Sequence, residues 1–312
     1  MTDHTATAPA IHDDLAAAFQ IDGWPVRGRL VRMGDAINTV LSSHKYPLPV
    51  ARLLGEACAL AALVGSSLKF EGRLLVQAQG DGPVRYVLAD YGTDGSLRGF
   101  CRYDEGELAA ACENKSNPGA EDLLGKGVFI MTLDRGPDFE RTQGLTPIEG
   151  DSLASCAEHY FVQSEQIPTK VNLALGEITT DTGTQYRAGG ALIQVIAADD
   201  ARGSTEDVWE RTRALFATLT DDELVDPTIT PETLLFRLFH EDGVRLEGAT
   251  PIKAQCRCSR DRIVTVLQSF PEDERDEMIE EDGKIHANCE YCSTDYLVDP
   301  AEVTPPAPEA RH

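Results

Sequence analysis

Two closely spaced cysteine pairs near the C-terminus constrain the fold of this chain more than any other feature. One pair is C-R-C at residues 256–258, the other is C-E-Y-C at residues 289–292, and the thirty residues from 259 to 288 contain no cysteine. Two such pairs can supply four thiolates to one tetrahedral zinc ion, because a short loop holds each pair and the chain between them closes the site. The sequence therefore predicts a small C-terminal module that binds one zinc per chain.

Structural disulfides are the alternative use of these cysteines. Residues 1–10 are polar and lack the apolar segment of a secretory signal, and no stretch approaches the roughly 18 uninterrupted apolar residues of a membrane span. We therefore expect a cytoplasmic protein without a membrane partner, where lasting disulfides are rare and paired cysteines more often bind metals or undergo redox chemistry. The single, widely spaced cysteines Cys58, Cys101, Cys112 and Cys156 are expected to be ordinary core thiols.

The negative charge of the chain is concentrated towards its C-terminal third. The formal net charge is −24, and residues 201–300 hold 23 Asp and Glu against 11 Lys and Arg, a net of −12. Such a surface repels phosphate backbones, so a nucleic-acid partner is not expected.

The first two hundred residues have the pattern of one mixed domain. Residues 50–68 carry apolar side chains at helical spacing, and residues 74–88 read as a strand, a turn at Gly80 to Pro83 and a second strand. Further strands are expected at residues 127–133, 171–175 and 191–196, the last entered through Gly189-Gly190, and a helix at 151–163 with Asp151 as its N-cap. Because strands and helices do not alternate regularly, the expected fold class is α+β.

No catalytic constellation is found in this core. The sequence contains no G-x-S-x-G, H-E-x-x-H or G-x-G-x-x-G motif, and G-K-G at residues 125–127 lacks the Ser or Thr and the spacing of a phosphate loop. His44 and His159 are isolated histidines, which are more often structural than catalytic. We expect no catalytic residues and a protein that is not an enzyme.

Residues 200–249 are predicted to form a charged helical linker. Ser204 or Thr205 can cap a first helix, and Thr230 followed by Pro231 can open a second. Both helices are near or below the length of about 12–15 residues at which an isolated helix is marginal in water, so both need another surface to pack on. Their apolar stripes comprise Val208, Trp209, Leu215, Phe216 and Leu219 in the first helix and Leu234, Leu235, Leu238 and Phe239 in the second.

The predicted zinc module has few residues with which to build a core. Ser259 can cap a helix that carries Ile263, Leu267 and Phe270, and a second helix is expected from Pro271 to a stop at Gly283. About fifty residues with so little apolar surface do not fold by burial alone, and zinc binding would supply roughly 10–16 kcal/mol. The expected segments are an uninformative N-terminal extension (1–19), the core domain (20–199), the helical linker (200–249), the zinc-binding domain (250–299) and a Pro-rich tail (300–312).

At these motifs the chain resembles the 33-kDa heat-shock protein family, the redox-regulated holdase chaperones. The resemblance includes CRCSRDR, the charged segment ending in EEDG, CEYC and the following YLVD, together with LLFRLFHEDGV in the linker. It continues through LKFEGRLLVQAQGDGP, GLTPIEGDSLASCAEHYFVQSEQIPT and AGGALIQVI, and so covers most of residues 20 to 300.

The resemblance implies a redox switch at Cys256, Cys258, Cys289 and Cys292. These four residues would hold zinc in a reduced, inactive form, and oxidation would release it. A sulfenic acid is resolved fastest by the nearest thiol, which gives the disulfides Cys256–Cys258 and Cys289–Cys292 that the resemblance also implies. The zinc module would then unfold and the apolar stripes of the linker would bind unfolding client proteins and prevent their aggregation, in a form that the resemblance suggests is a homodimer.

Two other classes of protein fit parts of this pattern. A thiol–disulfide oxidoreductase would use C-x-x-C at a helix N-terminus in a compact catalytic domain, whereas here C-E-Y-C is paired with a second cysteine motif. A zinc-ribbon interaction protein that reads nucleic acid would need a basic face, which the charge of residues 201–300 opposes.

Overall fold

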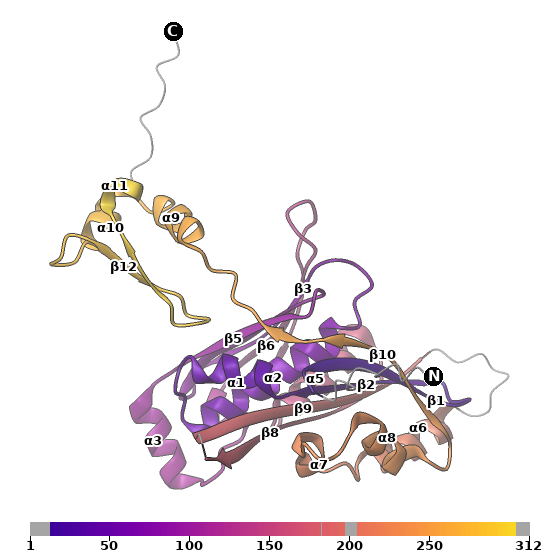
Figure 1. The fold of residues 1–312 in the computed structure, drawn as a ribbon. Helices are drawn as coiled ribbons and strands as arrows, with labels where there is room; N and C mark the ends of the chain where they lie inside the picture. The colour runs from indigo at the N-terminus through magenta and orange to yellow at the C-terminus, as the bar shows by residue number, and fades with distance from the viewer. Residues whose placement is uncertain (1–12, 182, 197–204, 304–312) are drawn as a thin grey trace, which may run out of the picture. The chain divides into compact units, whose positions relative to one another are not determined.

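The computed structural model describes residues 13–181, 183–196 and 205–303 of the chain. The chain divides into two compact units, Met1–Ala254 (unit 1) and Gln255–His312 (unit 2). Unit 1 contains two sheets with helices packed between and outside them, and the predicted α+β fold class is confirmed (Figure 1).

The first sheet of unit 1, sheet A, has five antiparallel strands in the order β10-β1-β2-β9-β8. Alternate side chains of its strands enter two different apolar clusters, so both faces of this sheet are covered. The strands are β1 (Leu15–Ile21), β2 (Val26–Met33), β8 (Thr169–Thr180), β9 (Gly183–Val195) and β10 (Val244–Pro251).

The second sheet, sheet B, has six strands in the order β11-β5-β4-β3-β6-β7. Its pairs are antiparallel except for the short parallel contact of β11 with β5. The strands are β3 (Arg73–Gly80), β4 (Val84–Gly92), β5 (Ser96–Tyr103), β6 (Gly127–Asp134), β7 (Thr142–Pro147) and β11 (Lys253–Ala254).

The helix α2 (Leu48–Gly65) packs against strands of both sheets and forms the centre of the main core. It is apolar on nearly all sides, and by length and composition alone it could cross a membrane, but 72% of it is buried inside unit 1. An all-round apolar helix of this kind is typical of a protein core. The other helices of this core domain are α1 (Asp35–Ser42), α3 (Glu105–Asn114), α4 (Ala120–Leu124), α5 (Leu153–Tyr160) and the π-helical turn η1 (Phe161–Glu165).

Most of the elements expected in unit 1 are present, with two corrections. The predicted helix, the strand–turn–strand unit and the three further strands are α2, β3–β4, β6, β8 and β9. The helix expected at 151–163 has Ser152 and not Asp151 as its N-cap, because the Ser152 hydroxyl accepts the Ser155 N–H at 3.2 Å, and it changes to π-helical geometry after Tyr160. Gly189-Gly190 lies within β9 and not at its start, since this strand forms one long hairpin with β8.

The linker segment packs on the face of sheet A that points away from α2. Its helices are α6 (Thr205–Phe216), α7 (Asp221–Val225) and α8 (Pro231–Phe239), and Figure 1 shows them along this face. Thr230 caps α8 as predicted, by accepting the Thr233 N–H at 3.2 Å, while Ser204 lies outside the described residues. Two elements of the linker were not predicted: α7, and the strand β10, which occupies residues that the sequence assigned to a helical linker.

Unit 2 is a small helix-and-hairpin module. Ser259 caps its first helix as predicted, accepting the Arg262 N–H at 3.3 Å. The second helix ends at Glu277 and not at Gly283. Gly283, with φ +76°, belongs to a turn in which the Glu280 N–H donates to the Lys284 carbonyl at 2.9 Å. The elements are α9 (Arg260–Gln268), α10 (Glu272–Glu277), β12 (Ile285–Asn288), β13 (Asp295–Val298) and α11 (Pro300–Val303).

Candidate metal centre

The two cysteine motifs lie on two loops of unit 2. The C-x-C motif occupies the segment immediately before α9, and the C-x-x-C motif forms the tip of the hairpin between β12 and β13. At this tip the carbonyl of Cys289 accepts the N–H of Cys292 at 3.2 Å and that of Ser293 at 2.7 Å, and the Cys289 N–H donates to Thr294 O at 3.0 Å. Ser293 completes the turn with a positive φ of 54°. These bonds turn both hairpin sulfurs to the same side.

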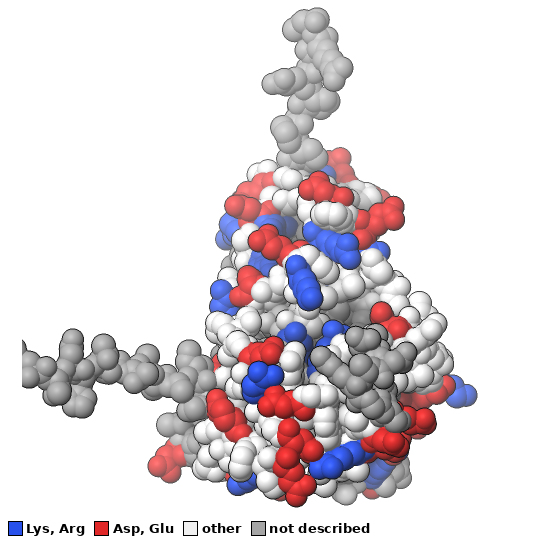
Figure 2. Space-filling view, turned by 90° about the vertical axis from the view of Figure 1, so that its right-hand side faces the viewer, with Lys and Arg blue, Asp and Glu red and all other residues white. Residues whose placement is uncertain are grey.

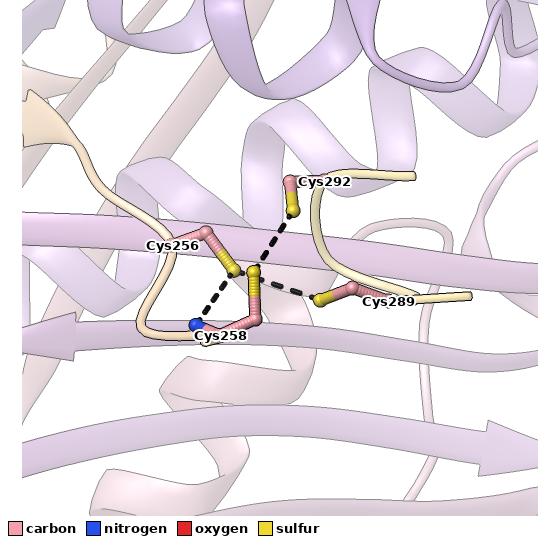
Figure 3. Close-up of side chains that lie close together, drawn as sticks. All are labelled: Cys256, Cys258, Cys289 and Cys292. Atoms are coloured by element: carbon pink, nitrogen blue, oxygen red, sulfur yellow. Dashed lines mark hydrogen bonds between the residues drawn. The ribbon is translucent and has the colours of Figure 1, made fainter. Parts of the chain in front are cut away.

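The four sulfurs converge on one point (Figure 3). All four Sγ atoms lie within 4.8 Å of one another, with Cys256 to Cys289 at 3.6 Å and Cys258 to Cys292 at 3.4 Å. A tetrahedral zinc with Zn–S bonds of about 2.3 Å would separate its sulfur ligands by about 3.8 Å. The donor set is also chemically suitable, since four soft sulfur ligands in tetrahedral geometry favour zinc or iron. Spacing and chemistry therefore fit a zinc ion.

Three hydrogen bonds support the sulfurs from outside the tetrahedron. The Cys258 N–H donates to Cys256 Sγ at 3.5 Å, the Tyr296 hydroxyl donates to Cys258 Sγ at 3.1 Å, and the Thr294 hydroxyl lies 3.2 Å from Cys292 Sγ. Bonds of this kind orient metal ligands and stabilise their charged form. Sequence analysis did not identify Tyr296 or Thr294; the only signal was their position directly after the C-x-x-C motif.

The surroundings give the thiols different acidities. Burial raises the pKa of Cys289 to about 12 and is also the main cause of the raised pKa of Cys258. Burial opposes ionisation of Cys292 as well, but hydrogen bonds from the hydroxyl and backbone N–H of Thr294 outweigh it and lower the pKa of Cys292 to about 7. Donation to Cys258 raises the pKa of Tyr296 to about 12. The protein alone therefore makes Cys292 the most readily ionised of these thiols for which a shift is resolved.

The hydrophobic core of unit 2 is small, as expected. Four apolar side chains are fully buried in it, and the half-buried ring of Tyr296 packs against them. Arg275 is also buried and donates to the carbonyl of Val303. The four buried residues are Leu267, Ile285, Val298 and Val303.

The linker residues proposed to bind clients are gathered into one cluster with sheet A. Six of the nine are buried and Val208, Trp209 and Leu215 are half-buried. The ring of Phe239 lies 6.0 Å, centroid to centroid, from that of Phe19 on β1. The buried six are Phe216, Leu219, Leu234, Leu235, Leu238 and Phe239. The apolar side chains of the linker and those of sheet A are therefore buried against each other.

Two arginines of sheet A also hold the linker, and sequence analysis did not identify them. Arg32, which is 1% exposed, donates to the carbonyl of Ile229 at 2.6 Å and to that of Asp226. Arg187 donates to the carbonyl of Val225 at 2.8 Å and pairs with Asp13. Arg187 binds the last residue of α7 and Arg32 binds the segment that joins α7 to α8, so this part of the linker is fixed by charged donors as well as by apolar packing.

The remaining cysteines and histidines do not form a second cluster among the described residues. Cys58, Cys101 and Cys156 are buried, and burial raises the pKa of Cys58 to about 12, which makes it unreactive. His44 stacks on Tyr46, whereas Nδ1 of His159 lies 2.9 Å from a carboxylate oxygen of Glu149. Cys112 is half-buried on α3.

Fold and site together define a class of protein: an α+β domain that carries a docked helical segment, followed by a small module with a cluster of four thiols that could hold a metal ion. The model of the family described as Hsp33 protein matches residues 14–299, and the chain therefore belongs to the Hsp33 family.

Individual relatives agree with this assignment over nearly the whole chain. The chain is 63% identical over 300 residues to a 33 kDa chaperonin of Caulobacter vibrioides, covering 96% of this chain and 99% of the relative. It is 33% identical over 292 residues to a 33 kDa chaperonin of Escherichia coli, covering 94% of each. The fold is similar to the crystal structure of a 33 kDa chaperonin from Thermotoga maritima, with a TM-score of 0.75 and 24% identity over 93% of this chain and 96% of that one. The name shared by these relatives describes a chaperone.

Proposed function

We propose that this protein is a redox-regulated holdase chaperone of the cytoplasm, which binds unfolding or oxidatively damaged proteins and prevents their irreversible aggregation. The observation that carries the proposal is the convergence of four sulfurs in a module whose described residues contribute four buried apolar side chains to its core, with five partly buried ones packed around them. A site of this kind makes the fold of the module depend on the oxidation state of its thiols.

Cys256, Cys258, Cys289 and Cys292 would hold one zinc ion in the reduced protein. Bound zinc would keep the four sulfurs as thiolates and contribute most of the stability of the module. Tyr296 and Thr294 would donate hydrogen bonds to two of these sulfurs and so stabilise their negative charge.

Oxidation by a peroxide would proceed in two steps at each pair. A thiolate attacks one peroxide oxygen, the O–O bond breaks, and a sulfenic acid and hydroxide form. The second thiolate then attacks the sulfenic sulfur, an S–S bond forms, and the S–O bond breaks with release of a second hydroxide, so two peroxide molecules are reduced for two disulfides.

We propose the pairs Cys256–Cys258 and Cys289–Cys292. The resting geometry does not select them, since the shortest sulfur contacts of 3.4 and 3.6 Å join the two motifs. Once one thiolate is oxidised the tetrahedron is lost, and residues two or three apart in sequence then meet most often. Peptide mapping under non-reducing conditions tests this pairing, and dominant cross-links between the motifs would contradict it.

Unfolding of unit 2 would reach the linker through the chain itself. Gln255, the first residue of unit 2, directly follows β11, which pairs with β5 through only two residues. The strand β10 comes immediately before β11 in the chain. We propose that loss of the module allows β11 and then β10 to detach, so that α6–α8 leave sheet A and expose their apolar side chains to clients. The active form is proposed to be a homodimer, which analytical ultracentrifugation before and after oxidation would test.

Surface charge agrees with protein clients and not with nucleic acid. On the face shown in Figure 2, acidic and basic side chains are interspersed, within a chain of net charge −24. A polyphosphate backbone would be repelled by this charge, whereas an exposed apolar surface on a strongly charged protein can hold clients and still stay soluble.

The test of the proposed function is an aggregation assay by light scattering on a thermally unfolding client. Reduced, zinc-loaded protein is expected to have little effect, and peroxide treatment with mild heat to suppress aggregation at a stoichiometric ratio. Cys256→Ser should hold much less than one equivalent of zinc by elemental analysis, while Cys58→Ser should switch like the wild type. Equal suppression by the reduced form would contradict the switch, and catalytic turnover of a disulfide substrate would favour an oxidoreductase instead.

Hydrogen exchange tests the structural part of the proposal. Residues 205–299 are expected to lose protection on oxidation while the core, residues 20–198, keeps it. If the linker kept its protection while the protein bound clients, another surface would be responsible.

A further inference from the structure

Unit 1 contains an apolar cavity that the proposed chaperone cycle does not use. It lies between sheets A and B beside the last turn of α2, and its volume is about 200 Å³. Its walls include Leu63, Leu74, Met131 and Leu192, and Phe161 of the π-helical turn lines it as well. For comparison, an apolar cavity of about 150 Å³ is large enough to bind benzene. The cavity can therefore accept a short stretch of hydrocarbon.

Two arginines of β2 lie at this cavity and have neutral partners. Arg27 donates to Oε1 of Gln194 at 3.1 Å, and Arg29 donates to Oγ of Ser66 at 3.2 Å. Among the described residues neither guanidinium forms an ion pair, although Glu165 also lines the cavity. Two cations with no paired carboxylate next to an apolar space are complementary to a ligand that has a hydrocarbon chain and one negative charge.

The polar side of the cavity is held in place by a buried network. Gln194, which is 6% exposed, donates from Nε2 to the Thr169 hydroxyl at 3.1 Å, and that hydroxyl donates to the Ile167 carbonyl at 3.0 Å. The oxygen of Gln194 is thereby directed towards Arg27 before any ligand arrives. On the same side η1 has π-helical geometry and is followed by Gln166 with φ 56°, and π-helical turns are frequent at functional sites.

We propose that this cavity binds a free anionic amphiphile with a single hydrocarbon chain, of the fatty-acid class. The chain would lie between the two sheets and the carboxylate would bind Arg27 and Arg29, since guanidinium and carboxylate groups match in geometry. Glu165 at the same site would disfavour a headgroup with a second negative charge. The proposal does not rest on the chaperone function and holds whether or not the protein is a holdase.

Isothermal titration calorimetry on the reduced, full-length protein tests this proposal. Decanoate below its micelle concentration is the probe, and decanol, which has the same chain without the charge, is the matched control. We expect one decanoate per chain and at least tenfold weaker binding of decanol. Arg29→Met should weaken decanoate at least tenfold and leave decanol unchanged, whereas Arg245→Gln, which removes an exposed arginine of β10, should change neither.

A cavity-filling variant checks where the ligand binds. Val64 and Leu68 also line the cavity. Val64→Phe should abolish binding of both probes, and Leu68→Phe serves the same purpose if Val64→Phe does not fold, as judged by circular dichroism. Equal affinity for decanol and decanoate, decanoate binding that survives Arg29→Met or the filled cavity, or no decanoate binding at all would each overturn the proposal.

Discussion

Replacement of Tyr296 by Phe should weaken zinc binding without removing a ligand. The tyrosine hydroxyl donates to Cys258 Sγ at 3.1 Å, and its half-buried ring packs in the core of unit 2. Phe keeps the ring and removes only the donor. A hydrogen bond to a charged acceptor contributes about 1.5–3 kcal/mol. Because water can partly replace a half-exposed donor, we expect a loss near the lower limit, about 1.5 kcal/mol, or roughly tenfold in zinc affinity.

The assay is zinc transfer to a chromogenic chelator under reducing conditions, with the wild type and the variant titrated in parallel. Tyr186→Phe is the matched control, since its hydroxyl bonds to Glu177 and not to a cysteine. Tyr296→Phe should also release zinc at a lower peroxide dose than the wild type, because the Cys258 thiolate loses a hydrogen-bond donor that stabilises it.

An unchanged zinc affinity in Tyr296→Phe would refute the reasoning. It would mean either that the hydroxyl does not bind the sulfur in the zinc-loaded protein or that Cys258 is not a ligand. Measurement of Cys258→Ser separates these two explanations, since only the second leaves its zinc content intact.

Three further predictions concern stability. Burial raises the pKa of Glu56 from 4.5 to about 8, so the stability that the protonated side chain provides is fully present below about pH 4.5 and is lost as the pH rises through about 8. The free energy of unfolding of Glu56→Gln, measured in urea, should therefore match that of the wild type near pH 4 and exceed it at pH 9 by up to about 5 kcal/mol. Arg32→Met removes two charged hydrogen bonds to the linker and should lower the free energy of local opening at residues 226–229 by about 3 kcal/mol. Hydrogen exchange at these residues should be faster, while β2 and β9 stay protected. Val298→Ala opens a hole in the small core of unit 2 and should lower zinc affinity by about 2 kcal/mol in chelator competition, whereas exposed Leu297→Ala on the same strand should have no effect.

Elements specified by local signals were predictable from the sequence. The α2 helix and the β3–β4 hairpin follow from apolar periodicity and a Gly-Pro turn, and the caps Ser259 and Thr230 follow from the preference of hydroxyl side chains for helix N-termini. The convergence of the four cysteines followed from their spacing, because two tight pairs have few ways to use four thiols.

Elements specified by tertiary contacts were not predictable. The strand β10 is largely exposed, and only its first four residues, Val244 to Glu247, alternate between half-buried and exposed. It is a strand because β1 offers it a row of unpaired backbone groups. Arg32 binds carbonyls almost two hundred residues away, and Tyr296 finds its cysteine only after the hairpin has closed. The predicted end of α10 was wrong because the charged sequence continues to Asp282, whereas the helix ends at Glu277 and the chain then turns at Gly283.

The position of β10 has a consequence for how a bound client could leave. The segment 196–243, which contains the linker helices α6–α8, connects β9 to β10, and these strands belong to one sheet with β2 and β1 between them. While both strands stay paired, the ends of a detached linker remain about 14 Å apart, three strand spacings, and the segment is a closed loop. Its helices then stay at a local concentration in the millimolar range relative to their own binding face. That face, with Phe19, Leu30 and Ile193, becomes a second apolar surface whenever the linker is away from it. Under the proposed mechanism, reduction would restore the pairing of β10, and the re-docking linker would then compete with the client as an intramolecular ligand and favour its release.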